Sequence, residues 1–178
     1  MILHYLKKKE NKDQELIDFI YVEIIKSANI IINKDLRFKK TDFNITFEVV
    51  SMLLFCFFIS QNEKFDKNRK IFNQGLMNLF IKDIDHSLRL TGLDMNLGKY
   101  VKKYVKKFYY RLSKFKEIIK EKDKKNFINY LSSYNLIDSN KNIDDITKEL
   151  IFFDRLQELS KMSQNIENNR FLFKKIFN

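Results

Sequence analysis

The stretch ITFEVVSMLLFCFFI, residues 45–59, decides the fold. It is apolar almost all round, and Glu48 is the one charged residue within it. A helix that is apolar on every side is buried, either in a protein core or in a membrane. A bilayer span requires about 20 apolar residues, which is more than this stretch offers. We therefore predict a helix at the centre of a bundle, with Cys56 as a small buried hydrophobe.

The composition supports an all-α fold. The chain has 178 residues, no proline and only three glycines, Gly75, Gly92 and Gly98. Turn-rich β folds draw on both residue types, and phosphate-binding loops require clustered glycines. A chain of this length buries about 70% of its unfolded surface, so it needs no disulfide or metal to fold. We predict one helical domain over residues 1–178, with residues 1–13 as a loose N-terminal arm.

Apolar residues recur at helical spacing along most of the chain. The pattern predicts a bundle of six or seven helices, at residues 14–33, 44–60, 67–91, 97–122, 124–134, 143–162 and 166–177. Gly92 is placed to end the third of these in the left-handed conformation. At the N-terminus the lysines follow the short apolar stretch, which is the reverse of a secretory signal.

Few residues suit catalysis. The histidines are His4 and His86, and the thiol of Cys56 has no basic neighbour in LLFCFF that would lower its pKa. Asp83 and His86 are three residues apart, but one carboxylate and one imidazole do not make a metal site. We expect no catalytic residue, metal or cofactor.

Asp83 and Asp85 differ in their predicted surroundings. On a helical wheel Asp83 falls between Phe72 and Leu76, so we expect it to be less exposed than Asp85 and to meet a cation or backbone N–H groups. Asp85 points toward the polar side and is placed to pair with Arg89.

The segment GKYVKKYVKKFYYRLSKF, residues 98–115, carries the strongest charge pattern. Its cations fill about half of the helical circumference, with no acid among them: Lys99, Lys102, Lys103, Lys106, Lys107, Arg111 and Lys114. One interpretation is a solvated lysine face. The other is a surface for ribosomal RNA, acidic lipid headgroups or an acidic protein. The residues alone leave both open.

Residues 74–112 resemble the ubiquinol–cytochrome c chaperone family. The matching residues follow the order and spacing of the family pattern: Gln74, Leu76, Asp83, Asp85, Leu88, Arg89, Gly92, Gly98, Lys99, Phe108, Tyr109 and Arg111. Leu90 stands where the family has an acid, and Tyr110 where it has glycine. Upstream of residue 74, the chain keeps only Phe47, followed by an acid, from the family pattern.

The resemblance implies an all-α assembly chaperone for the cytochrome bc complex, and not an enzyme. Its implied partners are newly made cytochrome b or other subunits of that complex, the ribosome, the anionic membrane surface and a second assembly factor. The implied location is the cytoplasmic face of the bacterial inner membrane, or the matrix side in a mitochondrion. The alternatives are a basic nucleic-acid-binding module and a small enzyme with a lipid or isoprenoid substrate.

Overall fold

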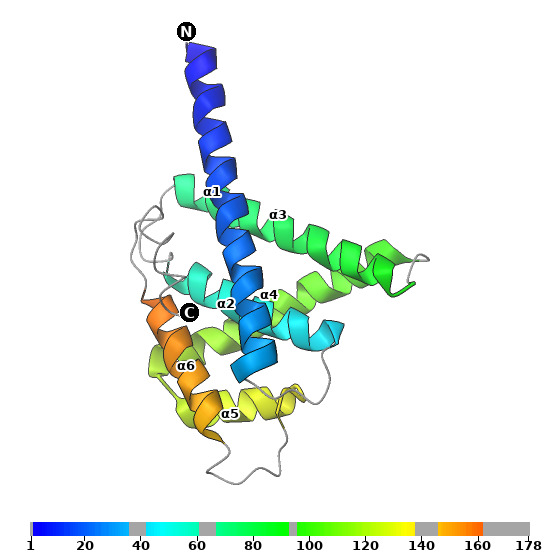
Figure 1. Cartoon of the computed structure of the whole chain (residues 1–178), viewed down its shortest axis with the longest axis vertical. Helices are drawn as coiled ribbons and strands as arrows, with labels where there is room; N and C mark the ends of the chain where they lie inside the picture. Colours follow the sequence, from blue (N-terminus) through cyan, green and yellow to red (C-terminus); the bar gives the residue numbers. More distant parts are fainter. Residues whose placement is uncertain (1, 36–41, 61–66, 93–95, 138–145, 162–178) are drawn as a thin grey trace.

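The computed structural model describes residues 2–35, 42–60, 67–92, 96–137 and 146–161, and this part of the chain is helical with no strand. Its elements follow one another as α1 Ile2–Ile30, a π-helical turn η1 Ile31–Asp35, α2 Phe43–Ser60, α3 Lys67–Leu90, α4 Leu97–Glu121, α5 Lys124–Ser133 and α6 Thr147–Ser160 (Figure 1). The predicted all-α class is confirmed.

The first helix differs from its prediction. It begins at Ile2, so the segment expected to be a loose arm is helical, and Figure 1 shows it projecting beyond the other helices. The buried apolar residues that the periodicity detected, such as Ile17, Ile20 and Ile24, lie in the later part of α1. The helix predicted at residues 166–177 lies outside the described residues.

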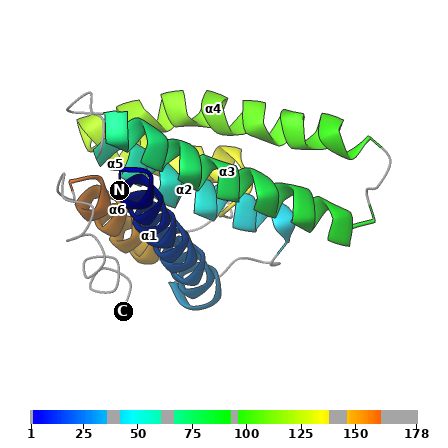
Figure 2. The same cartoon turned by 90° about the horizontal axis from the view of Figure 1, so that it is seen from above.

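The central position predicted for the apolar stretch is confirmed. Every residue from Phe47 to Phe57 in α2 is buried, and α2 contacts α1, α3, α4 and α6. Seen from above, α3 and α4 run side by side, with α1 and α6 toward the opposite edge (Figure 2). Within the described ranges, no helix combines the length and the apolarity that crossing a bilayer requires.

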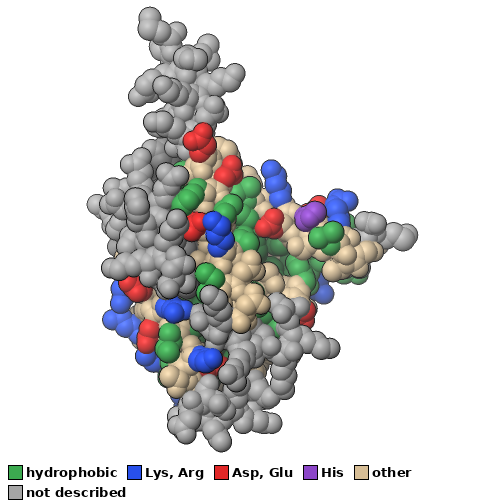
Figure 3. Space-filling model, in the orientation of Figure 1, with side chains coloured by type: hydrophobic (Ala, Val, Ile, Leu, Met, Phe, Trp, Pro, Cys, Tyr) green, Lys and Arg blue, Asp and Glu red, His purple; other side chains and the backbone are tan. Residues whose placement is uncertain are grey.

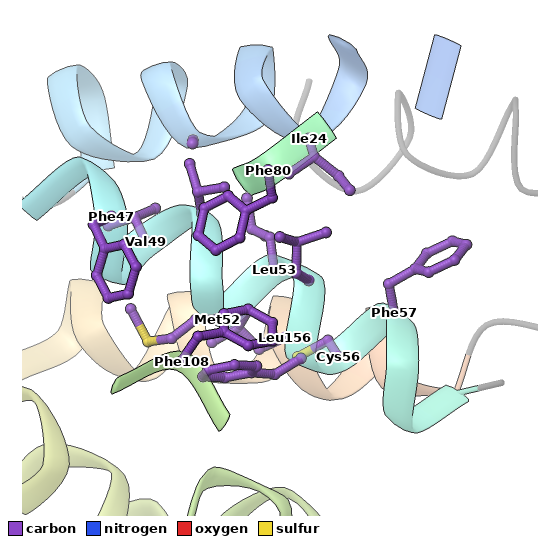
Figure 4. Packing of buried hydrophobic residues seen from close by; sticks show 14 of the residues in the cluster. Ile24, Phe47, Val49, Met52, Leu53, Cys56, Phe57, Phe80, Phe108 and Leu156 are labelled. Carbon is purple, nitrogen blue, oxygen red and sulfur yellow. The ribbon is translucent and has the colours of Figure 1, made fainter. Parts of the chain in front are cut away.

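Aromatic rings join α2, α3 and α4. Phe108 of α4 is fully buried, with its ring centroid 4.7 Å from that of Phe55 and 5.3 Å from that of Phe80 (Figure 4). Phe47 stacks on Phe80 at 5.7 Å. Tilted and edge-on ring pairs add to the free energy of area burial. This cluster fixes the position of α4 on the bundle.

Two glycines have distinct structural roles. A Cβ on Gly75 of α3 would lie 2.5 Å from Ile17 Cδ1 of α1, so the two helices approach closely at this point. Gly92 follows the end of α3 with a φ of 80°, and its N–H donates to the Arg89 carbonyl at 2.9 Å. The predicted left-handed role of Gly92 is confirmed.

Neighbouring residues on α4 test the aromatic cluster. Phe108→Ala removes a ring from the packed core and should lower the free energy of unfolding by about 3–5 kcal/mol. Tyr109→Ala is the control, because Tyr109 is 55% exposed and its loss should change stability by at most about 0.5 kcal/mol. Urea denaturation measures both. Equal midpoints for the two variants would contradict the central role of Phe108.

Candidate functional site

The helix α4 is held to the bundle along one side. The Tyr104 hydroxyl donates to Asn44 Oδ1 at 3.1 Å. The Tyr104 ring packs edge-on against the rings of Phe43 and Phe47, with centroids 5.0 Å apart in both pairs. Further along, the rings of Phe108 and Phe115 are buried. The opposite side of α4 is therefore presented on a helix that is anchored at several points.

Four predicted lysines occupy that outer side. Lys99, Lys102, Lys103 and Lys106 are all exposed, and residues 97–116 contain no acid. The face of the molecule that carries α1 differs, because it mixes acidic and basic side chains (Figure 3). We call these four residues the lysine face. Charges of one sign along several turns of a helix create a local positive potential that attracts anions.

The expectation that Lys107 and Arg111 belong to the same surface is wrong. Glu48 of α2 is only 2% exposed, and both cations turn toward it. Lys107 Nζ lies 3.0 Å from Glu48 Oε1, and the Arg111 guanidinium pairs with the same oxygen. Arg111 is itself buried, at 6% exposure. A charge pattern within one helix cannot reveal an acid that a neighbouring helix supplies.

Aromatic rings surround this ion cluster. The Arg111 guanidinium carbon lies 3.7 Å from the centroid of the Tyr134 ring, and Lys107 Nζ lies 5.0 Å from that of Phe47. Such cation–π contacts stabilise cations that have lost water. Burial lowers the pKa of Lys107, and the charge of Lys103 lowers it further. Burial also lowers the pKa of Arg111. Glu48 is therefore the counter-charge that keeps two partly desolvated cations in place.

A groove of about 700 Å³ lies between α3 and α4. Ile81, Val101 and Val105 supply its apolar lining. Lys82 of α3 and two members of the lysine face, Lys102 and Lys106, also line it. An apolar surface therefore adjoins the cationic one. No pattern within one helix indicates this groove, because it depends on how two helices pack side by side.

The prediction that Asp83 is less exposed than Asp85 is wrong. Asp83 is exposed, whereas Asp85 is partly buried. Asp83 accepts a hydrogen bond at Oδ2 from the Tyr21 hydroxyl, at 2.7 Å. The reason is geometric. The buried stripe of α3 is centred nearer Phe80 and Ile84, so Asp83 lies at its margin and reaches α1.

The other motif residues are mostly structural. The predicted pair is present, with Arg89 Nε donating to Asp85 Oδ2 at 2.8 Å. Leu88 and Phe108 are buried, while Tyr109 is exposed. Gly98 borders the groove. The motif therefore maps onto the packing of α3 against α4 and onto the groove between them.

The candidate catalytic and metal-binding residues are not brought together. Cys56 is completely buried, and burial raises the pKa of its thiol, which disfavours the reactive thiolate. Asp83 points to Tyr21, while Asp85 pairs with Arg89. Among the residues that the structure describes, no group of three or more His, Cys, Asp or Glu side chains is arranged to hold a metal ion.

By its fold, the described chain is an all-helical protein with a cationic surface on one helix. The sequence profile of the ubiquinol–cytochrome C chaperone family matches residues 34–163. The chain therefore belongs to the ubiquinol–cytochrome c chaperone family.

A solved structure supports the fold. The crystal structure of the Cbp3 homolog from Brucella abortus is similar, with a TM-score of 0.75 and 20% sequence identity. The similarity covers 92% of this chain and 90% of that chain. No curated protein sequence matches this chain.

A double-mutant cycle tests the ion cluster. Arg111→Met leaves the buried Glu48 carboxylate with Lys107 as its remaining partner, and should lower the free energy of unfolding by about 3 kcal/mol. Adding Glu48→Gln should recover part of that loss, because the unpaired charge is gone. Lys106→Met is the control on the exposed face and should be nearly neutral. If the effects of Glu48→Gln and Arg111→Met on the free energy of unfolding simply add, the two side chains do not form a stabilising pair.

The contact between Tyr21 and Asp83 should make stability sensitive to alkaline pH. Burial raises the pKa of Tyr21 above its ordinary value of 10.0, and the hydrogen bond to Asp83 raises it further. The folded protein therefore keeps this proton where the unfolded chain loses it. The resulting stabilisation is complete below about pH 10 and declines as the pH rises above it.

Tyr21→Phe provides the test of this contact. It should lower the free energy of unfolding at neutral pH by about 1 kcal/mol, because one hydrogen bond is lost. Above pH 10 the gap between wild type and variant should narrow. Asp83→Asn, which keeps an acceptor, should retain more stability than Asp83→Leu. Urea denaturation measures these free energies. If the difference between wild type and Tyr21→Phe stays constant across the alkaline range, the contact between Tyr21 and Asp83 does not cause the pH dependence.

Proposed function

We propose that this chain is an assembly chaperone for the cytochrome bc complex that binds newly made cytochrome b or another subunit of that complex. It docks through the lysine face on a polyanionic surface close to where its client is made. In a bacterium that place is the cytoplasmic face of the inner membrane, beside the ribosome. Membership of the chaperone family supports the first part of the proposal.

The docking role is supported by the fact that the cations of α4 fall into two sets, one paired and one exposed. Lys107 and Arg111 both pair with Glu48, so their positions follow from the packing of the bundle. Lys99, Lys102, Lys103 and Lys106 are exposed on an acid-free stretch. A solvated helix face ordinarily mixes both signs of charge. Ribosomal RNA and anionic lipid are the polyanions expected at this location.

The alternative function, a sequence-reading nucleic-acid module, is less well supported. Base edges are read mainly by arginine or lysine on guanine and by asparagine or glutamine on adenine, and residues 97–116 contain no asparagine or glutamine. Arg111, the arginine of α4, is buried and pairs with Glu48. The lysine face carries charge, which attracts phosphate groups without distinguishing sequences. Any binding of nucleic acid by this face should therefore be independent of sequence and strongly dependent on salt.

Charge reversal tests the docking role. Replacing Lys99, Lys102, Lys103 and Lys106 with Glu changes the formal net charge by −8, from +11 to +3. Co-sedimentation with inner-membrane vesicles and ribosomes should fall strongly. The loss should be larger at low salt than at high salt, because the Debye length is about 10 Å at 0.1 M. Circular dichroism should be unchanged, since lysine and glutamate have similar helix propensities.

The matched control reverses four exposed lysines elsewhere: Lys70, Lys120, Lys125 and Lys148. It has the same net charge as the test variant, so any difference between the two reports the location of the charge. If both variants lose binding equally, the lysine face has no special role. The client is tested separately, by affinity purification of the chain from native membranes and scoring for cytochrome b. Recovery of other membrane proteins with no subunit of the cytochrome bc complex would overturn the chaperone assignment.

A further inference from the structure

The groove between α3 and α4 combines an apolar lining with cations at its edges. Ile81 lies on one wall, and Val101 and Val105 lie on the other. Lys82 faces them from α3, and Lys102 and Lys106 from α4. The volume of about 700 Å³ lies within the range of small-molecule sites, which is about 300–1,000 Å³.

Two residues extend this apolar strip along α4. Gly98 lines the groove, and a Cβ placed on it would meet no atom within 4 Å, so the space above it is open. Tyr109 lies four residues after Val105, on the same side of the helix, and is 55% exposed. Val101, Val105 and Tyr109 therefore form one row beside the row of Lys102 and Lys106. Tyrosine and lysine beside an apolar strip are typical of protein surfaces that meet the membrane interface.

We propose that this groove binds an anionic phospholipid from the membrane surface. Part of an acyl chain lies against Ile81, Val101 and Val105, and the phosphate is placed among Lys82, Lys102 and Lys106. No covalent step is involved. The inference deepens the proposed function and rests on it, because it identifies the polyanion that the lysine face meets as membrane lipid.

The chemistry of the groove favours lipid over an acidic helix of a partner protein. Protein–protein interfaces are depleted in lysine and enriched in arginine, which binds carboxylates with a directional fork. The cations that line this groove are all lysines. Asp85 is the acid that lines the groove, and it already pairs with Arg89, whose Nε donates to Asp85 Oδ2 at 2.8 Å. Flexible point charges beside an apolar strip suit a ligand that offers charge and hydrocarbon without a fixed pattern of hydrogen bonds.

Vesicle flotation tests the proposal with the full chain. Binding should be strong to vesicles of phosphatidylcholine mixed with phosphatidylglycerol and weak to phosphatidylcholine alone. Replacing Lys102 and Lys106 with Gln should lower the partition coefficient about 30-fold, since each lysine contributes about fivefold. Lys120 and Lys125, both exposed and away from the groove, provide the control pair with the same change in charge.

Gly98→Leu separates the groove from simple charge attraction. The leucine leaves the net charge unchanged and fills open space in the groove. It should lower binding to the anionic vesicles about tenfold, which is the loss expected if about two methylene groups of the acyl chain no longer enter the groove. Ser113→Leu is the control, because Ser113 is exposed on α4 and does not line the groove. It should leave binding unchanged or slightly stronger. If Gly98→Leu binds as well as wild type, the acyl chain does not enter the groove.

Fluorescence quenching provides a second measurement that needs no loss of binding. The chain has no tryptophan, so Tyr109→Trp introduces a single reporter within the apolar row, and Tyr110→Trp places one on the lysine side. Phosphatidylglycerol brominated along its acyl chain should quench the residue 109 reporter more than the residue 110 reporter. Equal quenching would overturn the proposal.

The possible results separate this inference from the proposed function. Loss of vesicle binding on charge reversal of the lysine face, with Gly98→Leu unaffected, leaves the docking role and removes the lipid groove. Strong binding of the wild type to ribosomes or to an acidic amphipathic peptide, with none to anionic vesicles, likewise overturns the lipid assignment. Copurification of cytochrome b is scored independently, so a failed lipid test does not decide the client.

Discussion

The burial of one carboxylate, Glu48, determines how α4 is seated on the rest of the bundle. It lies in the most apolar of the described helices, where an unpaired charge would cost several kcal/mol or more. The helix α4 supplies the compensation, because Lys107 and Arg111 both reach Glu48. This requirement fixes the rotation of α4 about its own axis. Once α4 is held in that rotation, Phe108 points into the core and the remaining lysines point outward.

The same constraint separates structural cations from those available to a partner. Lys106 and Lys107 are adjacent in sequence, yet one is exposed and the other is paired with a buried acid. The family resemblance gains a physical meaning from this pairing. Arg111 follows Phe108 and Tyr109 at the end of the residues that match the family, and Glu48 is the acid that follows Phe47 upstream. Two distant parts of the pattern therefore meet as one ion cluster.

Periodicity predicted most of the fold because it records which residues of one helix avoid water. It identified α2 as central and placed the ends of α3 and α4 correctly, with Gly92 as the terminating residue. It failed where a result depends on two helices at once. Asp83 lies at the edge of its stripe and meets Tyr21, which no pattern within α3 reveals. The groove is likewise produced by the spacing between α3 and α4.

The type of cation on each face of α4 follows from what each face must do. A buried position requires a cation that can satisfy a carboxylate and also stack on a ring, and arginine does both with its planar guanidinium. Arg111 meets Glu48 and Tyr134 in this way. An outer position that meets a fluid or variable anionic surface benefits from a flexible stem and a compact charge, which lysine provides. The distribution of arginine inside and lysine outside is therefore consistent with a helix that is rigidly seated in the bundle and adaptable toward its partner.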